Sequence, residues 1–105
     1  MKQYLYHVSD EQNTKSILMD GLKRKNGFCI YLSEDPFSWW KPGMDIFRVR
    51  ITGLKGLKTT IPELDEILCF EDISALRVSR FLPGRMRLRR ATEEYERTHG
   101  GADNG

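Results

Sequence analysis

The sequence predicts an α+β domain. Segments rich in β-branched and aromatic residues, typical of strands, outnumber the segments that favour helices. Only short helical segments lie between them, and the later strands follow one another without helices between them. Regular alternation of strands and helices would instead favour a wound parallel sheet.

Size and composition are those of one globular domain. The chain has 105 residues, of which 39% are hydrophobic and 30% charged. No segment approaches the roughly 18 consecutive apolar residues of a membrane helix, and the first residues do not resemble a signal peptide. Cys29 and Cys69 lie in apolar strand-like runs. They favour buried free thiols in a cytoplasmic protein, with a Cys29–Cys69 disulfide as the alternative.

The first predicted strand covers residues 3–8 and is followed by a helix. Ser9 is the expected N-cap of that helix, with Gln12 completing a capping box. Gly21 is expected to end it, because glycine readily adopts the backbone conformation found after a helix.

A second strand is predicted over residues 28–32, followed by a short helix. Asp35 is the expected cap of this helix, and Pro36 suits its first position. From 45 to 51 apolar and polar residues alternate, which predicts a half-buried strand with Phe47, Val49 and Ile51 on one face.

The C-terminal part of the chain is predicted to hold more strands and one basic helix. Residues 59–62 read as a short extended piece, and strands are expected at 66–70 and 75–81. A helix is predicted over 85–98, and 99–105 reads as a frayed tail.

Arginines gather near the C-terminus although the net charge is only +2. Arg80 and four further arginines occur without an intervening acid, and the four are Arg85, Arg87, Arg89 and Arg90. One interpretation is a solvated helix, since Arg89 and Arg90 precede Glu93 and Glu94 by four residues. The other is that Arg85, Arg87, Arg89 and Arg90 contact phosphate groups or nucleic acid.

Several kinds of chemistry find no support in the sequence. The histidines and cysteines lack the closely spaced ligand pairs of structural zinc sites, so no metal is expected. No order of serine, cysteine and histidine indicates a hydrolase triad. The glycine patterns of dinucleotide-binding and P-loop folds are also missing, so any nucleotide must be held in another way.

Three short motifs follow one another along the chain. They are Tyr6-His7-Val8-Ser9, then Gly27-Phe28-Cys29-Ile30-Tyr31-Leu32-Ser33-Glu34-Asp35, then Asp65-Glu66-Ile67-Leu68-Cys69-Phe70 with Ile73 after it. In this order they resemble the His-Tyr-Glu branch of the ADP-ribosyltransferase superfamily, which includes PARP and diphtheria-toxin-like enzymes. They are also similar to the related RNA 2'-phosphotransferases. The resemblance covers roughly residues 3–81.

The resemblance implies a fold and a domain organisation. It implies split antiparallel β-sheets with two or three short helices. Residues 1–82 would form the ADP-ribosyltransferase-like part, and residues 83–105 a basic helix and flexible tail of the same domain.

The resemblance also implies a role for each motif residue. His7 would hold the adenosine ribose of NAD, and Ser9 would help at the nicotinamide end. Tyr31 would stack on the nicotinamide ring. Glu66 would stabilise the positive charge that develops on the nicotinamide ribose. Apart from the resemblance, Trp39 and Trp40 are expected to cap the core, and the alternative is that one of them, Trp40, forms a second wall of the nicotinamide pocket.

Two acidic neighbours of Glu66 remain alternatives for the carboxylate that acts on the nicotinamide ribose. Glu63 and Asp65 lie close to Glu66, which is favoured because it leads directly into the apolar strand. His7 and Tyr31 taken singly are also ordinary strand residues.

The expected activity is NAD-dependent transfer of ADP-ribose to a protein or nucleic acid, with NAD as substrate. The alternatives are an inactive module that binds NAD, ADP-ribose or a partner, and an RNA 2'-phosphotransferase-like enzyme.

Overall fold

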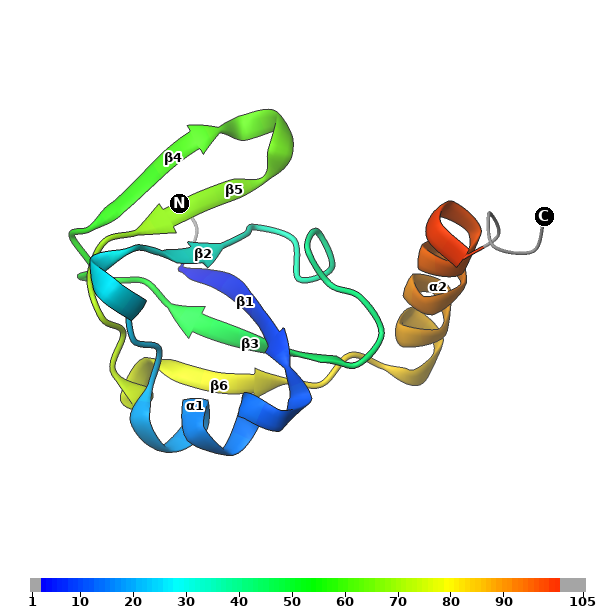
Figure 1. Ribbon diagram of the computed structural model, residues 1–105, viewed down its shortest axis with the longest axis horizontal. Helices are drawn as coiled ribbons and strands as arrows, with labels where there is room; N and C mark the ends of the chain where they lie inside the picture. Colours follow the sequence, from blue (N-terminus) through cyan, green and yellow to red (C-terminus); the bar gives the residue numbers. More distant parts are fainter. Residues whose placement is uncertain (1–2, 101–105) are drawn as a thin grey trace.

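The computed structural model describes residues 3–100. Two three-stranded antiparallel sheets form the body of the molecule, with strand orders β1-β3-β6 and β2-β5-β4 (Figure 1). The strands are β1 (Tyr4–Asp10), β2 (Ile30–Leu32), β3 (Met44–Arg50), β4 (Leu57–Ile61), β5 (Glu66–Cys69) and β6 (Val78–Phe81). The predicted α+β class with antiparallel sheets is confirmed.

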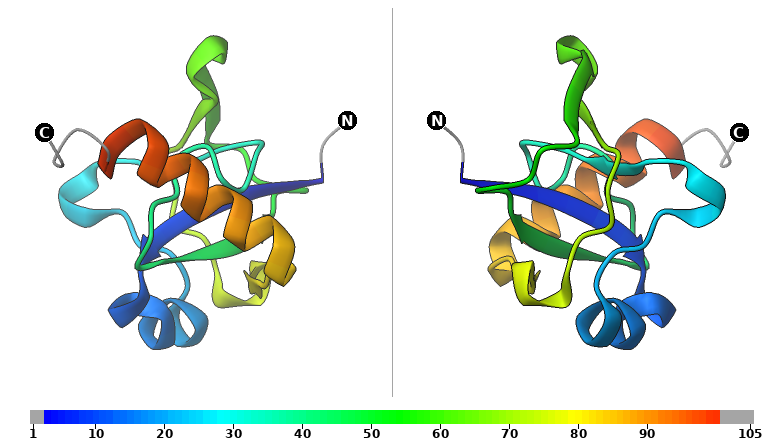
Figure 2. Two further views of the ribbon diagram at one scale, coloured as in Figure 1. Left: turned by 90° about the vertical axis from the view of Figure 1, so that its right-hand side faces the viewer. Right: turned by 90° about the vertical axis from the view of Figure 1, so that its left-hand side faces the viewer.

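Two α-helices lie at different ends of this body. Helix α1 (Thr14–Asp20) packs beside β6, and α2 (Arg85–Tyr95) stands away from both sheets (Figure 1). Figure 2 shows α1 and the β4–β5 hairpin on opposite sides of the body. Within residues 3–100, both helices are too short and too polar to cross a bilayer.

Short 3₁₀ and π turns complete the regular structure. The 3₁₀ turns are Glu11–Asn13, Lys25–Gly27, Pro62–Leu64 and Ala75–Arg77, and a π-helical turn, Glu96–Gly100, continues α2.

The two sheets are joined through their backbones. The N–H of Tyr6 donates to the carbonyl of Ser33 over 2.8 Å, and the N–H of Ser33 donates back to Tyr6 over 2.9 Å. Outside the strands, Leu22 after α1 and Ile73 after β5 exchange a further pair of bonds, both of 2.8 Å. The first of these bridges places the end of β2 directly beside β1.

The hydrophobic core fills the space between the sheets and α1. Its buried residues are Leu5, Ile17, Leu22, Ile30, Leu32, Phe47, Val49, Ile67, Cys69 and Ile73. Strand β3 alternates as predicted over its second half, with Phe47 and Val49 buried and Arg48 and Arg50 exposed, but Ile46, expected on the arginine face, is buried as well. Cys29 and Cys69 are free thiols, so the alternative of a disulfide between them is wrong.

The predicted cap of the first helix is wrong. Strand β1 continues to Asp10, so Ser9 is a strand residue, and α1 begins only at Thr14 after a 3₁₀ turn. The Ser9 hydroxyl instead accepts a hydrogen bond from the Asn13 side chain over 3.0 Å. The end of the helix is confirmed: Gly21 has φ +81° and donates its N–H to Ile17 over 2.8 Å.

The helix predicted after Asp35 is also wrong. The Asp35 carboxylate does accept the Phe37 N–H over 2.8 Å, as a cap would, but the chain continues as turns. The reason is tertiary, because the Asp65 carboxylate takes the N–H of Asp35 over 2.9 Å and a hydroxyl hydrogen bond from Ser38.

Later boundaries shift by a few residues. The first part of the strand expected at 75–81 is the 3₁₀ turn that Ser74 caps by accepting the Leu76 N–H over 3.2 Å. Helix α2 ends at Tyr95 rather than 98. Of the expected tail, residues 101–105 lie outside the described residues.

Candidate functional site

The first two motifs meet where β1 and β2 run side by side. The His7 ring, on β1, hydrogen-bonds through Nδ1 to the backbone carbonyl of Tyr31 over 2.9 Å. A carbonyl only accepts hydrogen bonds, so Nδ1 must carry the proton. In the neutral ring Nε2 is then left as an acceptor.

The surroundings of His7 favour its neutral form. Burial lowers the pKa of His7 below its usual value of 6.5, and the bond to the Tyr31 carbonyl opposes this with a smaller effect. At neutral pH the ring is therefore uncharged. A neutral Nε2 is suited to accept a hydrogen bond from a hydroxyl group.

His7 and Tyr31 both line a cavity of about 580 Å³. Its volume is within the range of small-ligand sites. Part of its lining comes from β1 and the 3₁₀ turn after it and includes Ser9 and Asn13, whose side chains are hydrogen-bonded to each other. Another part comes from the segment before β2 and includes Phe28 and Cys29. The cavity thus lies beside the residues of the first two motifs.

Tyr31 offers an open ring face. Its side chain is 58% exposed although its neighbours Ile30 and Leu32 are buried. The pKa of the Tyr31 phenol is raised. The largest cause is a hydrogen bond with the Cys29 side chain, followed by the charge of that same side chain. Burial and the Glu66 carboxylate raise the pKa by smaller amounts. Electrostatic coupling therefore reaches from Tyr31 to the third motif.

Glu66 stands on the same sheet face as Tyr31. Tyr31 lies opposite Leu68 in the β2–β5 pair, and Glu66 is two positions from Leu68 on β5. Residues directly opposite each other share a face, as do alternate residues of one strand. The pairing thus places the Tyr31 and Glu66 side chains on the outer side of this sheet.

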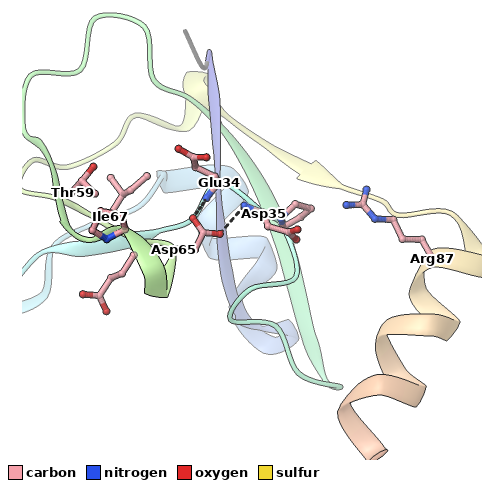
Figure 3. Close-up of a pocket in the computed structure, with 9 residues that line it drawn as sticks. Glu34, Asp35, Thr59, Asp65, Ile67 and Arg87 are labelled. Atoms are coloured by element: carbon pink, nitrogen blue, oxygen red, sulfur yellow. Dashed lines mark hydrogen bonds between the residues drawn. The ribbon is translucent and has the colours of Figure 1, made fainter. Parts of the chain in front are cut away.

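Glu66 lines a second cavity, of about 600 Å³, and not the one that His7 lines. Acidic side chains are prominent in it, with Arg87 from α2 at its edge (Figure 3). The structure therefore brings His7 and Tyr31 together and places Glu66 on the Tyr31 face, next to a separate hollow.

Asp65 holds the loop that follows β2. Its carboxylate accepts the backbone N–H groups of Glu34 over 2.7 Å and of Asp35 over 2.9 Å (Figure 3). The residue itself has φ +51°, in the left-handed region. Glu63 is exposed in the 3₁₀ turn before it. Of the three neighbouring acids, Asp65 has a loop-holding role that the sequence reasoning missed.

Trp40 does not belong to the lining of the His7 cavity. Its indole N–H donates to the Met44 carbonyl over 3.0 Å, and its ring meets Phe37 edge to face at 5.4 Å. Among the described residues that line the cavity, Met44 is the nearest to Trp40 in sequence, and it is the residue whose carbonyl accepts this hydrogen bond. The indole N–H of Trp39 donates to the Asp65 carbonyl over 3.1 Å and so supports the loop that follows β2.

The arginines of α2 do not share one face. Arg89 pairs with Glu93 over 3.6 Å, as the four-residue spacing predicts, whereas Glu94 pairs with Arg97 rather than Arg90. Arg87 turns toward the body of the protein, where it lies over the Phe37 ring at 5.2 Å. The solvated-helix interpretation holds for Arg89.

Metal ligands do not cluster in the part of the chain that the structure describes: no three His, Cys, Asp or Glu side chains gather to hold an ion there. Compared with known families and with curated proteins, the sequence matches no family model and no curated protein.

Proposed function

We propose that the protein is an NAD-dependent ADP-ribosyltransferase that transfers ADP-ribose to a protein or nucleic acid and releases nicotinamide. The observation that carries this proposal is the joining of His7 to Tyr31 across β1 and β2, with Glu66 on the same sheet face as Tyr31. The resemblance of the three motifs to the His-Tyr-Glu branch supports the same reading.

The neutral His7 ring suits the ribose of a nucleotide. With the Nδ1 proton directed at the Tyr31 carbonyl, Nε2 accepts a hydrogen bond from a ribose hydroxyl. Ser9 lines the same cavity and adds a hydroxyl that both donates and accepts.

Tyr31 and Glu66 act on the nicotinamide end. The exposed Tyr31 ring stacks on the flat nicotinamide and orients the bond to be broken. As that bond breaks, its electron pair leaves with nicotinamide and positive charge develops on the ribose. The Glu66 carboxylate stabilises that charge, and the acceptor forms the new bond to the ribose carbon while losing a proton.

Glu66→Gln tests this assignment, with Glu63→Gln as the matched control three positions away. Nicotinamide release from NAD is measured by chromatography in the presence of cell lysate as acceptor. Loss of a charge-stabilising group is expected to slow release by about 100-fold or more. The Glu63 variant should retain the wild-type rate. Full activity of Glu66→Gln contradicts the proposal.

A binding module without turnover is the second candidate function. The separation of Glu66 from the His7 cavity favours it, because a nucleotide held beside His7 need not meet the carboxylate. Calorimetry separates the two candidates. Heat of NAD binding without nicotinamide release supports the module, and no binding of NAD or ADP-ribose contradicts both.

A further inference from the structure

The sheet β1-β3-β6 has an outer face on which aromatic rings alternate with arginines. Its strands pair Tyr4 with Arg50 and Tyr6 with Arg48. Phe81, from β6, lies opposite Ile46 on the same face. Tyr4, Tyr6, Arg48 and Arg50 alternate with the buried Leu5, Phe47 and Val49, so their side chains point away from the core, whereas Ile46, at the Phe81 end of this face, is itself buried. We call this surface the aromatic-arginine face and include Arg87 of α2, which lies over the Phe81 ring at 5.7 Å.

We propose that the aromatic-arginine face binds single-stranded nucleic acid. Ring surfaces stack on unpaired bases, and guanidinium groups bind the phosphates between them. The proposal is independent of NAD chemistry, because His7 lies on the opposite face of β1 from Tyr6.

The rings form a platform on this face. Tyr6 and Phe81 meet edge to face with their centroids 5.3 Å apart. Tyr4, two positions from Tyr6, keeps 39% of its side chain exposed. Arg48 lies over the Tyr4 ring, and the exposed remainder of that ring offers the flat apolar surface that base stacking requires regardless of base identity.

The cations of this face are available to an anionic partner. Within residues 3–100, the ion pairs of arginines use Arg24, Arg80, Arg89 and Arg97, and not Arg48, Arg50 or Arg87. Arg48 and Arg87 are instead held over aromatic rings, Arg48 at 4.9 Å from the centre of Tyr4. A guanidinium held in this way keeps its N–H donors for phosphate oxygens and its outer plane for a base.

The combination of rings and cations selects a single strand. In a duplex the bases are stacked on one another and cannot reach Tyr4 or Tyr6. An acidic peptide would engage the arginines but supplies no bases for the rings. Single-stranded RNA and DNA share the chemistry that fits both components.

Fluorescence anisotropy of labelled oligonucleotides tests the proposal without NAD. The probes are oligouridine and oligothymidine of about 12 nucleotides, a typical site length, and a duplex of the same length. Both single strands are expected to bind, with affinity falling as salt rises from ~50 to ~200 mM. Duplex binding as tight as single-strand binding, or no binding of either single strand, overturns the proposal.

Two variants separate charge from stacking. Arg48→Ala with Arg50→Ala should weaken binding at least tenfold at low salt and reduce the salt slope by roughly 1.4, since each phosphate contact contributes about 0.7. Tyr4→Ala should weaken binding at least fivefold with an unchanged slope, because stacking is worth about 1–3 kcal/mol per base.

Lys15→Ala with Lys58→Ala is the matched control, since both lysines are exposed on other parts of the surface. This variant should bind within twofold of wild type, and circular dichroism checks that each variant is folded. Equal losses in the lysine and arginine variants would indicate a general attraction to polyanions and overturn the proposal. Weaker binding of the arginine variant together with unchanged binding of Tyr4→Ala would overturn the proposal as well.

Discussion

The His7 ring is hydrogen-bonded to the backbone, and not the side chain, of Tyr31, a residue 24 positions away. The tautomer of His7 is therefore set by the pairing of two strands. It follows that the side chain at position 31 can be changed without removing the partner of His7.

Tyr31 variants should separate stacking from hydrogen bonding. Tyr31→Phe keeps the flat ring, so NAD binding measured by calorimetry should stay within about threefold of wild type. Tyr31→Ala removes the ring and should weaken binding by roughly tenfold, the effect of losing about 1.4 kcal/mol of stacking and burial. Because Tyr31 is 58% exposed, neither variant should lose the fold. Equal affinity of the alanine variant would remove Tyr31 from the site.

Stability should depend on pH through His7. Burial lowers the pKa of His7 in the folded state, so the unfolded chain takes up the proton first as pH falls below about 6.5. The free energy of unfolding should therefore be highest above that pH and decrease toward the lowered folded pKa, at most by about 1.4 kcal/mol per pH unit.

Urea titrations between about pH 7.5 and 5.5 measure this effect. His7→Gln should flatten the profile, because it removes the group whose pKa is lowered by burial. A profile that His7→Gln does not alter would contradict the assignment.

Asp65→Asn should destabilise the loop after β2. The carboxylate accepts two backbone N–H groups and the Ser38 hydroxyl, and a neutral amide cannot satisfy all of them. The free energy of unfolding is expected to fall by about 1–3 kcal/mol in urea titration. Glu63→Gln is the control and should change it by less than about 0.5 kcal/mol. If both variants are equally stable, Asp65 does not hold the loop.

Gly21→Ala and Gly27→Ala form a matched pair for backbone packing. Both glycines have positive φ, +81° and +77°. A Cβ on Gly21 would lie 2.2 Å from the Ile73 carbonyl, whereas a Cβ on Gly27 would meet nothing within 4 Å.

Gly27→Ala should therefore cost only the left-handed backbone strain, about 1–2 kcal/mol. Gly21→Ala adds a clash with backbone and should cost clearly more, which thermal unfolding would detect as a lower Tm. Similar Tm values for the two variants would contradict this reading.

The strands were predictable because their signals are local. The alternation around Phe47 and Val49 predicts β3, and Gly21 marks the end of α1. The helix expected at Asp35 failed for a reason outside its own sequence. Asp65, which follows β4 in the sequence, holds that segment in turns, and no local sequence pattern contains this contact.

The candidate site was predictable in its parts but not in its assembly. The order of motifs selected His7, Tyr31 and Glu66, and the first two do meet. That Glu66 lies next to a separate hollow follows from the pairing of β2 with β5, which depends on tertiary packing. Trp40 follows the Tyr31 strand in sequence, yet its indole is bonded to Met44 at the start of β3.

The pairing of β2 also dictates when the site is assembled. β2 spans only Ile30–Leu32, with the Tyr6–Ser33 bridge on one edge and β5 on the other. During synthesis His7 and Tyr31 emerge from the ribosome before β3, β4 and β5 do. At that moment β2 therefore lacks its main partner, β5. Pairing between segments so distant in sequence is slow to form. The hollow beside His7 is lined by residues between His7 and Tyr31 and by Met44, and we expect it to become stable only after β2 has gained β5 as its partner.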